Sequence, residues 1–91
     1  MDEVTVLQMY SFGDSQYILV ELTHAGRIFK LSFSLTIRGR VKITPPVFEV
    51  HNRNEHSLIN QDNLPRPVRN WVEEMKPTLL IALQGEGWGD E

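Results

Sequence analysis

The sequence contains no cysteine. Disulfides, thiolate metal sites and cysteine nucleophiles are therefore excluded. No apolar run approaches the roughly 18 residues that a membrane-spanning helix needs. The first residues, Met1 to Val4, also lack the basic and then apolar order of a secretory signal. We therefore expect an intracellular protein, cytoplasmic or nuclear.

Acidic residues are missing from one long stretch. Between Leu22 and Phe48 there is no Asp or Glu, but there are five cations: Arg27, Lys30, Arg38, Arg40 and Lys42. The stretch carries +5 within a chain of net charge −3. Two interpretations stay open. Exposed strands use Lys and Arg to discourage edge-to-edge pairing, and a basic patch attracts an acidic partner.

The length of 91 residues predicts one small domain, 1–91, with residues 84–91 as a flexible tail. Folding of a chain this short buries about two-thirds of its unfolded surface. That supports one modest core and leaves little room for a deep, enclosed active site. The sequence leaves the oligomeric state open.

The chain is organised around the segment from Arg27 to Ile37. Its odd positions from Phe29 onward are large and apolar, and its even positions from Lys30 are polar. Successive side chains of a strand point to opposite faces, so this alternation predicts a β-strand with one face in the core.

The preceding segment, Tyr17 to Thr23, predicts a second strand that pairs with this one. If His24 to Arg27 closes the hairpin, four cross-strand pairs keep each face consistent. They are Leu22 with Phe29, Val20 with Leu31, Ile18 with Phe33, and Glu21 with Lys30. A slip by one residue would mix the two faces, which strongly favours this register.

Further strands are predicted on either side of this hairpin. Residues 4–10 form the first strand. Residues 41–43 follow Gly39, either after a three-residue hairpin turn or as the continuation of one long strand that bends at this glycine. Thr44-Pro45-Pro46 should end the ladder because proline lacks the N–H donor. Residues 47–50 form a last short strand, and 51–67 a loop with one helical turn.

A C-terminal helix is predicted from an apolar stripe at helical spacing. The stripe consists of Val68, Trp71, Val72, Met75, Leu79 and Leu83. Pro65 and Pro67 suit its first turn, and Asp62 or Asn63 its cap. Pro77 should kink the helix without ending it. The fold class is therefore α+β: an antiparallel meander of four or five strands with a C-terminal helix on one face.

The sequence offers little chemistry. His51, Glu55 and His56 are the only cluster of ligand-type side chains, and their loop supplies no clear third or fourth metal ligand. Glu73 and Glu74 splay about 100° apart on a helix, which is typical of a solvated face. Trp88 lies in a Gly-rich tail, as a docking anchor or in a disordered segment. We expect no metal, no cofactor and no enzymatic activity.

The order of these pieces resembles the fold of ubiquitin-conjugating (E2) enzymes and of their non-catalytic relatives, the ubiquitin E2 variants and RWD-type domains. Phe33, Leu35 and Ile37 match the family's alternating strand, and Pro45-Pro46 its double proline. The segment from His56 to Asn60 falls at its His-Pro-Asn-Ile-type turn. Val41-Lys42 replaces the usual Tyr-Pro, and Ser57-Leu58 replaces Pro-Asn.

The resemblance implies a protein-binding module. The family's catalytic cysteine would lie near Arg66, and without one the chain cannot form a ubiquitin thioester. The implied function is that of an adaptor or subunit whose partner is ubiquitin, a ligase or a scaffold protein. The surface that we predict for the partner carries Lys30, Arg38, Arg40 and Lys42. The alternatives are a small inhibitor of mobile-element type and, with less support, a nucleic-acid binder that uses the basic strands 27–42.

Overall fold

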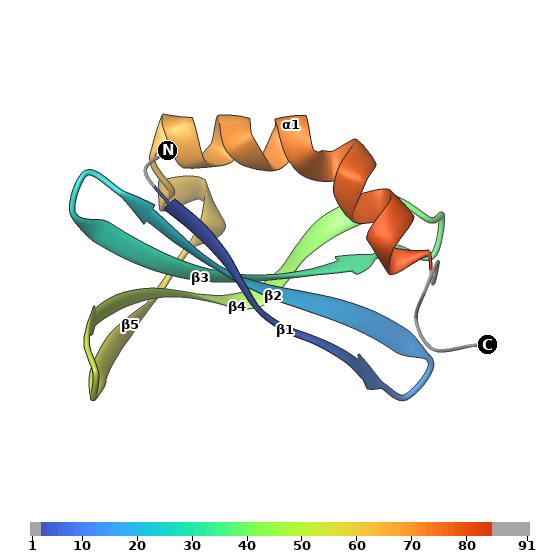
Figure 1. Ribbon diagram of the computed structural model, residues 1–91, viewed down its shortest axis with the longest axis horizontal. Helices are drawn as coiled ribbons and strands as arrows, with labels where there is room; N and C mark the ends of the chain where they lie inside the picture. Colours follow the sequence, from blue (N-terminus) through green and yellow to red (C-terminus); the bar gives the residue numbers. More distant parts are fainter. Residues whose placement is uncertain (1–2, 85–91) are drawn as a thin grey trace.

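The computed structural model describes residues 3–84 as one antiparallel sheet with one long helix on a single face (Figure 1). The strands are β1 (Glu3–Phe12), β2 (Ser15–His24), β3 (Arg27–Leu35), β4 (Val41–Asn52) and β5 (Glu55–Ile59), and they lie in sequence order. A 3-10 helix, η1 (Gln61–Asn63), leads to α1 (Arg66–Leu83). The predicted α+β meander is confirmed. Residues 85–91, which include Trp88 and most of the predicted tail, lie outside the described residues.

The register of β2 against β3 is the one that the sequence predicts. Leu22 lies opposite Phe29, Val20 opposite Leu31, and Ile18 opposite Phe33, with Glu21 opposite Lys30. The six apolar members of these pairs are all at most 3% exposed. Cross-strand partners share a face of the sheet, so the pairing alone places three apolar layers under the helix.

Helix α1 covers this apolar face with the predicted stripe. Val68, Val72, Leu79 and Leu83 are buried, and the Trp71 ring lies 6.3 Å from that of Phe33. The helix continues through Pro77, and Figure 1 shows its second half turning toward the sheet. Its N-cap is Pro65, so the prediction of Asp62 or Asn63 was wrong; η1 is capped by the Asn60 side chain, which accepts from the Asp62 N–H.

Strand β4 corrects the prediction that Thr44-Pro45-Pro46 ends the ladder. It runs through both prolines because the pairing is interrupted there: Ser32 pairs with Thr44, but Lys30 pairs with Phe48. This bulge leaves Pro45 and Pro46 outside the β3 ladder, and pairing with β5 begins only at Val47. The missing N–H donors of the prolines therefore cost no ladder hydrogen bond.

The predicted loop at 51–67 was also wrong over most of its length. Strand β4 continues to Asn52 and pairs with β5, and only η1 matches the expected helical turn. The strand was missed because this segment contains polar, turn-type residues: His51, Asn52 and Asn54. Asn52 stabilises this turn, because its side-chain oxygen accepts from the Asn54 N–H at 2.9 Å. Polar strand residues are possible here because β5 is an exposed edge.

Candidate functional site

The β3–β4 connection is a tight hairpin turn, which resolves the two alternatives at Gly39. The Thr36 N–H donates to the Arg40 carbonyl at 2.7 Å, and the Gly39 N–H donates to the Thr36 carbonyl at 2.8 Å. The Thr36 hydroxyl also accepts from the N–H groups of Arg38 and Arg40. Gly39 has φ +79°, a conformation that favours glycine. The turn is thus fixed by its own hydrogen bonds.

This turn overturns the prediction that Ile37 belongs to the strand and its core. β3 ends at Leu35, and Ile37 stands at the tip of the turn with its side chain fully exposed, at 103%. Arg38 follows it directly and Arg40 lies two residues further along the same turn, and both are exposed. An isoleucine is therefore presented to solvent on a rigid turn that also carries two exposed arginines.

Three of the four predicted partner-binding residues belong to this hairpin, and one does not. Arg38 and Arg40 lie in the turn, and Lys42 follows on β4, opposite Ser34. We call the turn 36–40 together with Lys42 the basic hairpin. Lys30 lies four residues before Ser34 along β3, about 13 Å away at the rise of a strand. It is partly buried on the sheet face that α1 leaves open.

An apolar groove adjoins the basic hairpin on the helix side. It has a volume of about 390 Å³ and is lined by Gly39, Arg40, Val41, Lys76, Pro77 and Leu80. Lys76 also pairs with Glu73 at 3.0 Å. Within residues 3–84, no ion pair engages Arg38, Arg40 or Lys42. The groove therefore combines an apolar floor with one cation at its rim, Arg40, that forms no ion pair among the described residues.

Arg27 is separated from the other cations by its own partner. Its Nε and Nη2 donate to the two carboxylate oxygens of Glu49, both at 2.8 Å. The guanidinium also lies over the Phe29 ring, 5.0 Å from the centroid. These hydrogen bonds hold the pKa of the Glu49 carboxyl below its ordinary value. Arg27 therefore fastens β3 to β4 and is not part of the free basic surface.

The Arg27–Glu49 pair predicts a specific acid sensitivity. Because the folded-state pKa of Glu49 is lowered, its contribution to stability is present above the ordinary value of 4.5 and is lost as the pH falls below it. Glu49→Gln should therefore flatten the fall of the free energy of unfolding on acidification, measured by urea unfolding at a series of pH values. Glu74→Gln, on the exposed side of α1, should follow the wild type. An unchanged slope in Glu49→Gln would contradict the prediction.

Lys30 lies in a small pocket on the open face of the sheet. The pocket has a volume of about 240 Å³ and is lined by Leu19, Lys30, Ser32, Pro46, Phe48 and His56. The Phe48 and His56 rings meet edge to face at 4.8 Å. Tyr10 and Tyr17 stack at 5.1 Å on the same face. This face therefore carries four rings: Tyr10 of β1, Tyr17 of β2, Phe48 of β4, which lies opposite Lys30, and His56 of β5.

The histidine cluster is divided by the β4–β5 hairpin. His51 Nε2 lies 2.8 Å from the Ser57 hydroxyl, and Glu55 accepts from the Asn52 amide at 2.9 Å. His56 instead packs on Phe48. In the part of the chain that the structure describes, no group of three His, Asp or Glu side chains is placed to hold a metal ion.

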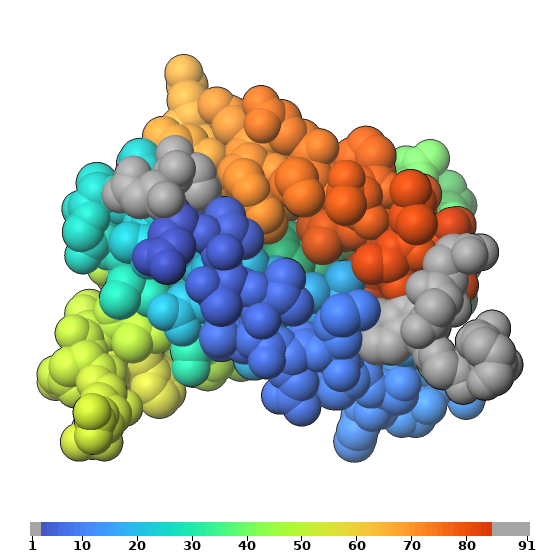
Figure 2. Space-filling view, in the orientation of Figure 1, coloured from blue at the N-terminus to red at the C-terminus, as the bar shows by residue number. Residues whose placement is uncertain are grey.

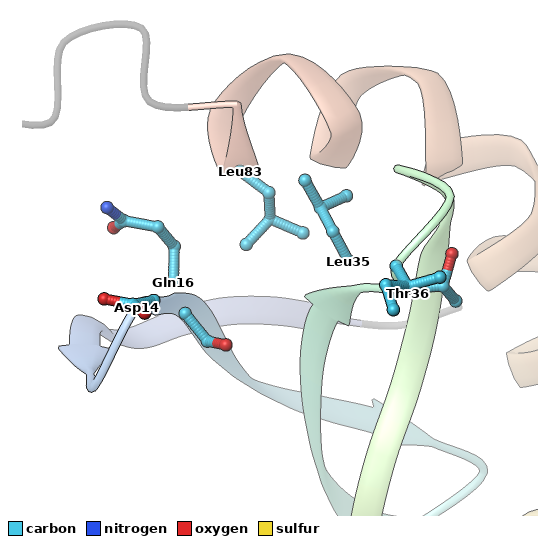
Figure 3. A pocket seen from close by; sticks show the side chains of 7 residues that line it. Asp14, Gln16, Leu35, Thr36 and Leu83 are labelled. Atoms are coloured by element: carbon cyan, nitrogen blue, oxygen red, sulfur yellow. The ribbon is translucent and has the colours of Figure 1, made fainter.

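A further pocket lies where α1 ends. Figure 3 shows Leu83 of α1 beside Leu35 of β3, with Asp14 and Gln16 of the β1–β2 hairpin across from them. The pocket has a volume of about 390 Å³ and is also lined by Thr36 and Ile37. It therefore joins the base of the basic hairpin to the end of the helix, and it brings together no pair of groups suited to acid–base chemistry.

Sequence reasoning missed two parts of this site. Lys76 and Pro77 are 34 residues or more from the basic hairpin in sequence, and only the packing of α1 brings them beside Arg40. The exposure of Ile37 was hidden by the unbroken alternation. The signal that could have shown it is Gly39, since a glycine that closes a three-residue turn removes the two residues before it from the strand.

The chain matches no protein-family model, and neither the curated proteins nor the solved structures contain a protein that matches it. No helix among residues 3–84 is long and apolar enough to cross a membrane. The site geometry is thus the basis for a functional conclusion.

Proposed function

We propose that this chain is a non-catalytic protein-interaction module that binds an acidic partner through the basic hairpin. The observation that carries the proposal is the exposed Ile37 in the same turn as Arg38 and Arg40, and this turn adjoins an apolar groove. Arginine is enriched among the residues that dominate binding energy, and an exposed apolar side chain in the same turn as arginines can be desolvated as an anchor. The cations would guide an acidic surface to it.

Two features favour binding over catalysis. The hairpin is rigid, held by the hydrogen bonds of Thr36, so little conformational freedom is lost when a partner docks. Its cations also form no ion pair among the described residues, so a partner carboxylate would not compete with an internal ion pair. An adaptor or scaffold subunit needs such a surface and no reactive group.

The likeness to ubiquitin E2 variants and RWD-type domains extends this proposal to a class of partner. What supports it is the order of the alternating strand, Pro45-Pro46 and the His56 segment in the sequence, with the family's catalytic cysteine missing. In the structure, the residues that follow the double proline continue β4, and His56 lies in β5. Ubiquitin or a scaffold subunit of a ligase complex is then the protein to test first. A free-standing inhibitor of mobile-element type would use the same hairpin against an acidic target enzyme.

The experiment is an affinity capture with the tagged full chain, with and without nuclease, followed by calorimetry with the purified partner and with purified ubiquitin. Arg38→Glu/Arg40→Glu should weaken the binding of an acidic protein partner at least tenfold, which corresponds to about 1.4 kcal/mol. The matched control is Arg53→Glu/Arg69→Glu, which reverses two exposed cations elsewhere. Equal affinity of the two double variants would remove the basic hairpin from the interface.

A second candidate is single-stranded nucleic acid on the open face of the sheet. The observation that favours it is the presence there of Lys30 with the stacked pair Tyr10 and Tyr17, and with Phe48 and His56. Bases stack on such rings. The net charge of −3 and the position of Glu21 opposite Lys30 oppose it. Capture that disappears with nuclease, and an oligonucleotide affinity that falls steeply with salt, would establish it in place of the first proposal.

A further inference from the structure

Strand β1 is an unprotected edge of the sheet. It pairs with β2 on one side, and among the described residues no strand pairs with its other side. It is ten residues long and carries one charge, Glu3, at its first position. Proteins usually protect such edges with Lys, Pro or a short strand. The opposite edge, β5, is five residues long and carries Glu55 and His56, and so follows that rule.

The apolar surface of the molecule is concentrated on this strand. The described residues include eight large hydrophobic side chains that are exposed, and five of them belong to β1: Val4, Val6, Leu7, Met9 and Phe12. Figure 2 shows β1 in blue, running along the near face of the molecule beside α1. A groove of about 200 Å³ lies between the two elements, lined from β1 by Val4, Val6 and Met9 and from α1 by Trp71, Met75 and Thr78, among others.

A bulge places the apolar residues of β1 on the helix side. Val4 and Val6 pair with the core residues Leu22 and Val20, and after the shift at Leu7, Met9 pairs with the core residue Ile18. Without the bulge, Val6 and Met9 would point to opposite faces, since side chains alternate along a strand. With it, the helix side of β1 presents Val4, Val6 and Met9 as one continuous apolar row.

We propose that the occupant of this edge is a second copy of the chain, in a two-fold symmetric dimer with antiparallel β1 strands. Centring the two-fold axis between Leu7 and Gln8 sets Val6 against Met9 of the second copy and Val4 against its Ser11. These four residues lie on the helix side of each sheet, because their β2 partners do. The strand is therefore complementary to itself, as a two-fold interface requires.

Charge and size also favour a second copy. In this register the two Glu3 side chains lie at opposite ends of the interface, so no like charges meet. A dimer of ordinary size buries about 800 Å² on each copy, about an eighth of the 6215 Å² surface of this chain. β1 is about 33 Å long at the rise of a strand, close to the 39 Å longest extent of the molecule. The interface would therefore extend along most of the length of the molecule.

Sedimentation equilibrium of the full chain, at concentrations across the micromolar range, tests the proposal. The expected mass is twice 10.5 kDa. Val6→Lys should give a folded monomer, since Val6 is 57% exposed in a single copy but would be buried with Met9 in the dimer. The matched control is Leu58→Lys at the other edge, which should remain a dimer. A wild-type monomer throughout this range, or a dimer that Val6→Lys leaves intact, would overturn the proposal.

The absence of cysteine allows a direct test of the register. Val6→Cys/Met9→Cys should form a covalent dimer on mild oxidation, because each new thiol would face its counterpart in the second copy. Val6→Cys alone should not, since its opposite residue is Met9; efficient cross-linking of this single variant would contradict the register.

If the wild type is a monomer and Trp88→Ala is a dimer, the C-terminal segment is the occupant in the intact chain and the proposal fails.

Discussion

Phe33→Ala is expected to lower the free energy of unfolding by about 3–5 kcal/mol. The Phe33 side chain is fully buried, lies opposite Ile18 and Ile43 on its two neighbouring strands, and packs on Trp71. Its truncation removes apolar contact with both layers and leaves a cavity that the sheet cannot close. In a domain of this size the melting temperature should fall by roughly 15–30 °C, measured by circular dichroism.

Ile37→Ala is the matched control for this prediction. In the sequence, Ile37 occupies the same alternating odd register as Phe33, but its side chain is fully exposed in the β3–β4 turn. The free energy of unfolding should change by no more than about 0.5 kcal/mol, as for other surface substitutions. A loss comparable to that of Phe33→Ala would mean that Ile37 is buried in solution, and the site built on its exposure would then be wrong.

Val72→Asp should leave most of the chain unfolded at room temperature. Val72 is 4% exposed in the middle of α1, on the stripe that covers the sheet. Burying an unpaired carboxylate costs several kcal/mol, which is comparable to the whole stability of a small domain. The measurement is the loss of the ellipticity at 222 nm and of a cooperative thermal transition.

Asn70→Asp separates burial from the mere addition of an acid to the helix. Asn70 lies two residues earlier on α1 and is exposed. The free energy of unfolding of Asn70→Asp should stay within about 0.5 kcal/mol of the wild-type value. A cooperative transition of near wild-type stability in Val72→Asp would mean that α1 does not pack on the sheet through this stripe.

The elements that were predictable are those whose signal is local. The alternation of β3 specifies which face is buried, and that constraint admits one register against β2, since a slip by one residue would put Glu21 against Phe29. The stripe from Val68 to Leu83 likewise identifies the face of α1 that packs. Both signals are repeated over many residues and both concern a single buried face.

The elements that were missed have no repeated signal. β5 is polar because it is an edge strand, and its backbone pairing with β4 stabilises it in place of buried apolar side chains. Pro45 and Pro46 interrupt a ladder only where the neighbouring strand needs their N–H groups, and the bulge opposite Leu31 removes that need. Whether a segment has a partner strand depends on the whole sheet, so the sequence of that segment alone cannot predict it.

Local sequence patterns were sufficient for the α+β class, the β2–β3 register, the buried face of the helix and the grouping of five cations between Leu22 and Phe48. Tertiary contacts were needed to show which of those cations form an ion pair within residues 3–84, since the Arg27–Glu49 hydrogen bonds join residues 22 apart, and the packing of α1 brings Lys76 beside Arg40. They were also needed to show that Ile37 is exposed and that no strand among the described residues covers the apolar edge of β1. Burial and pairing depend on which neighbours a residue acquires, whereas periodicity reports only the direction in which a side chain points.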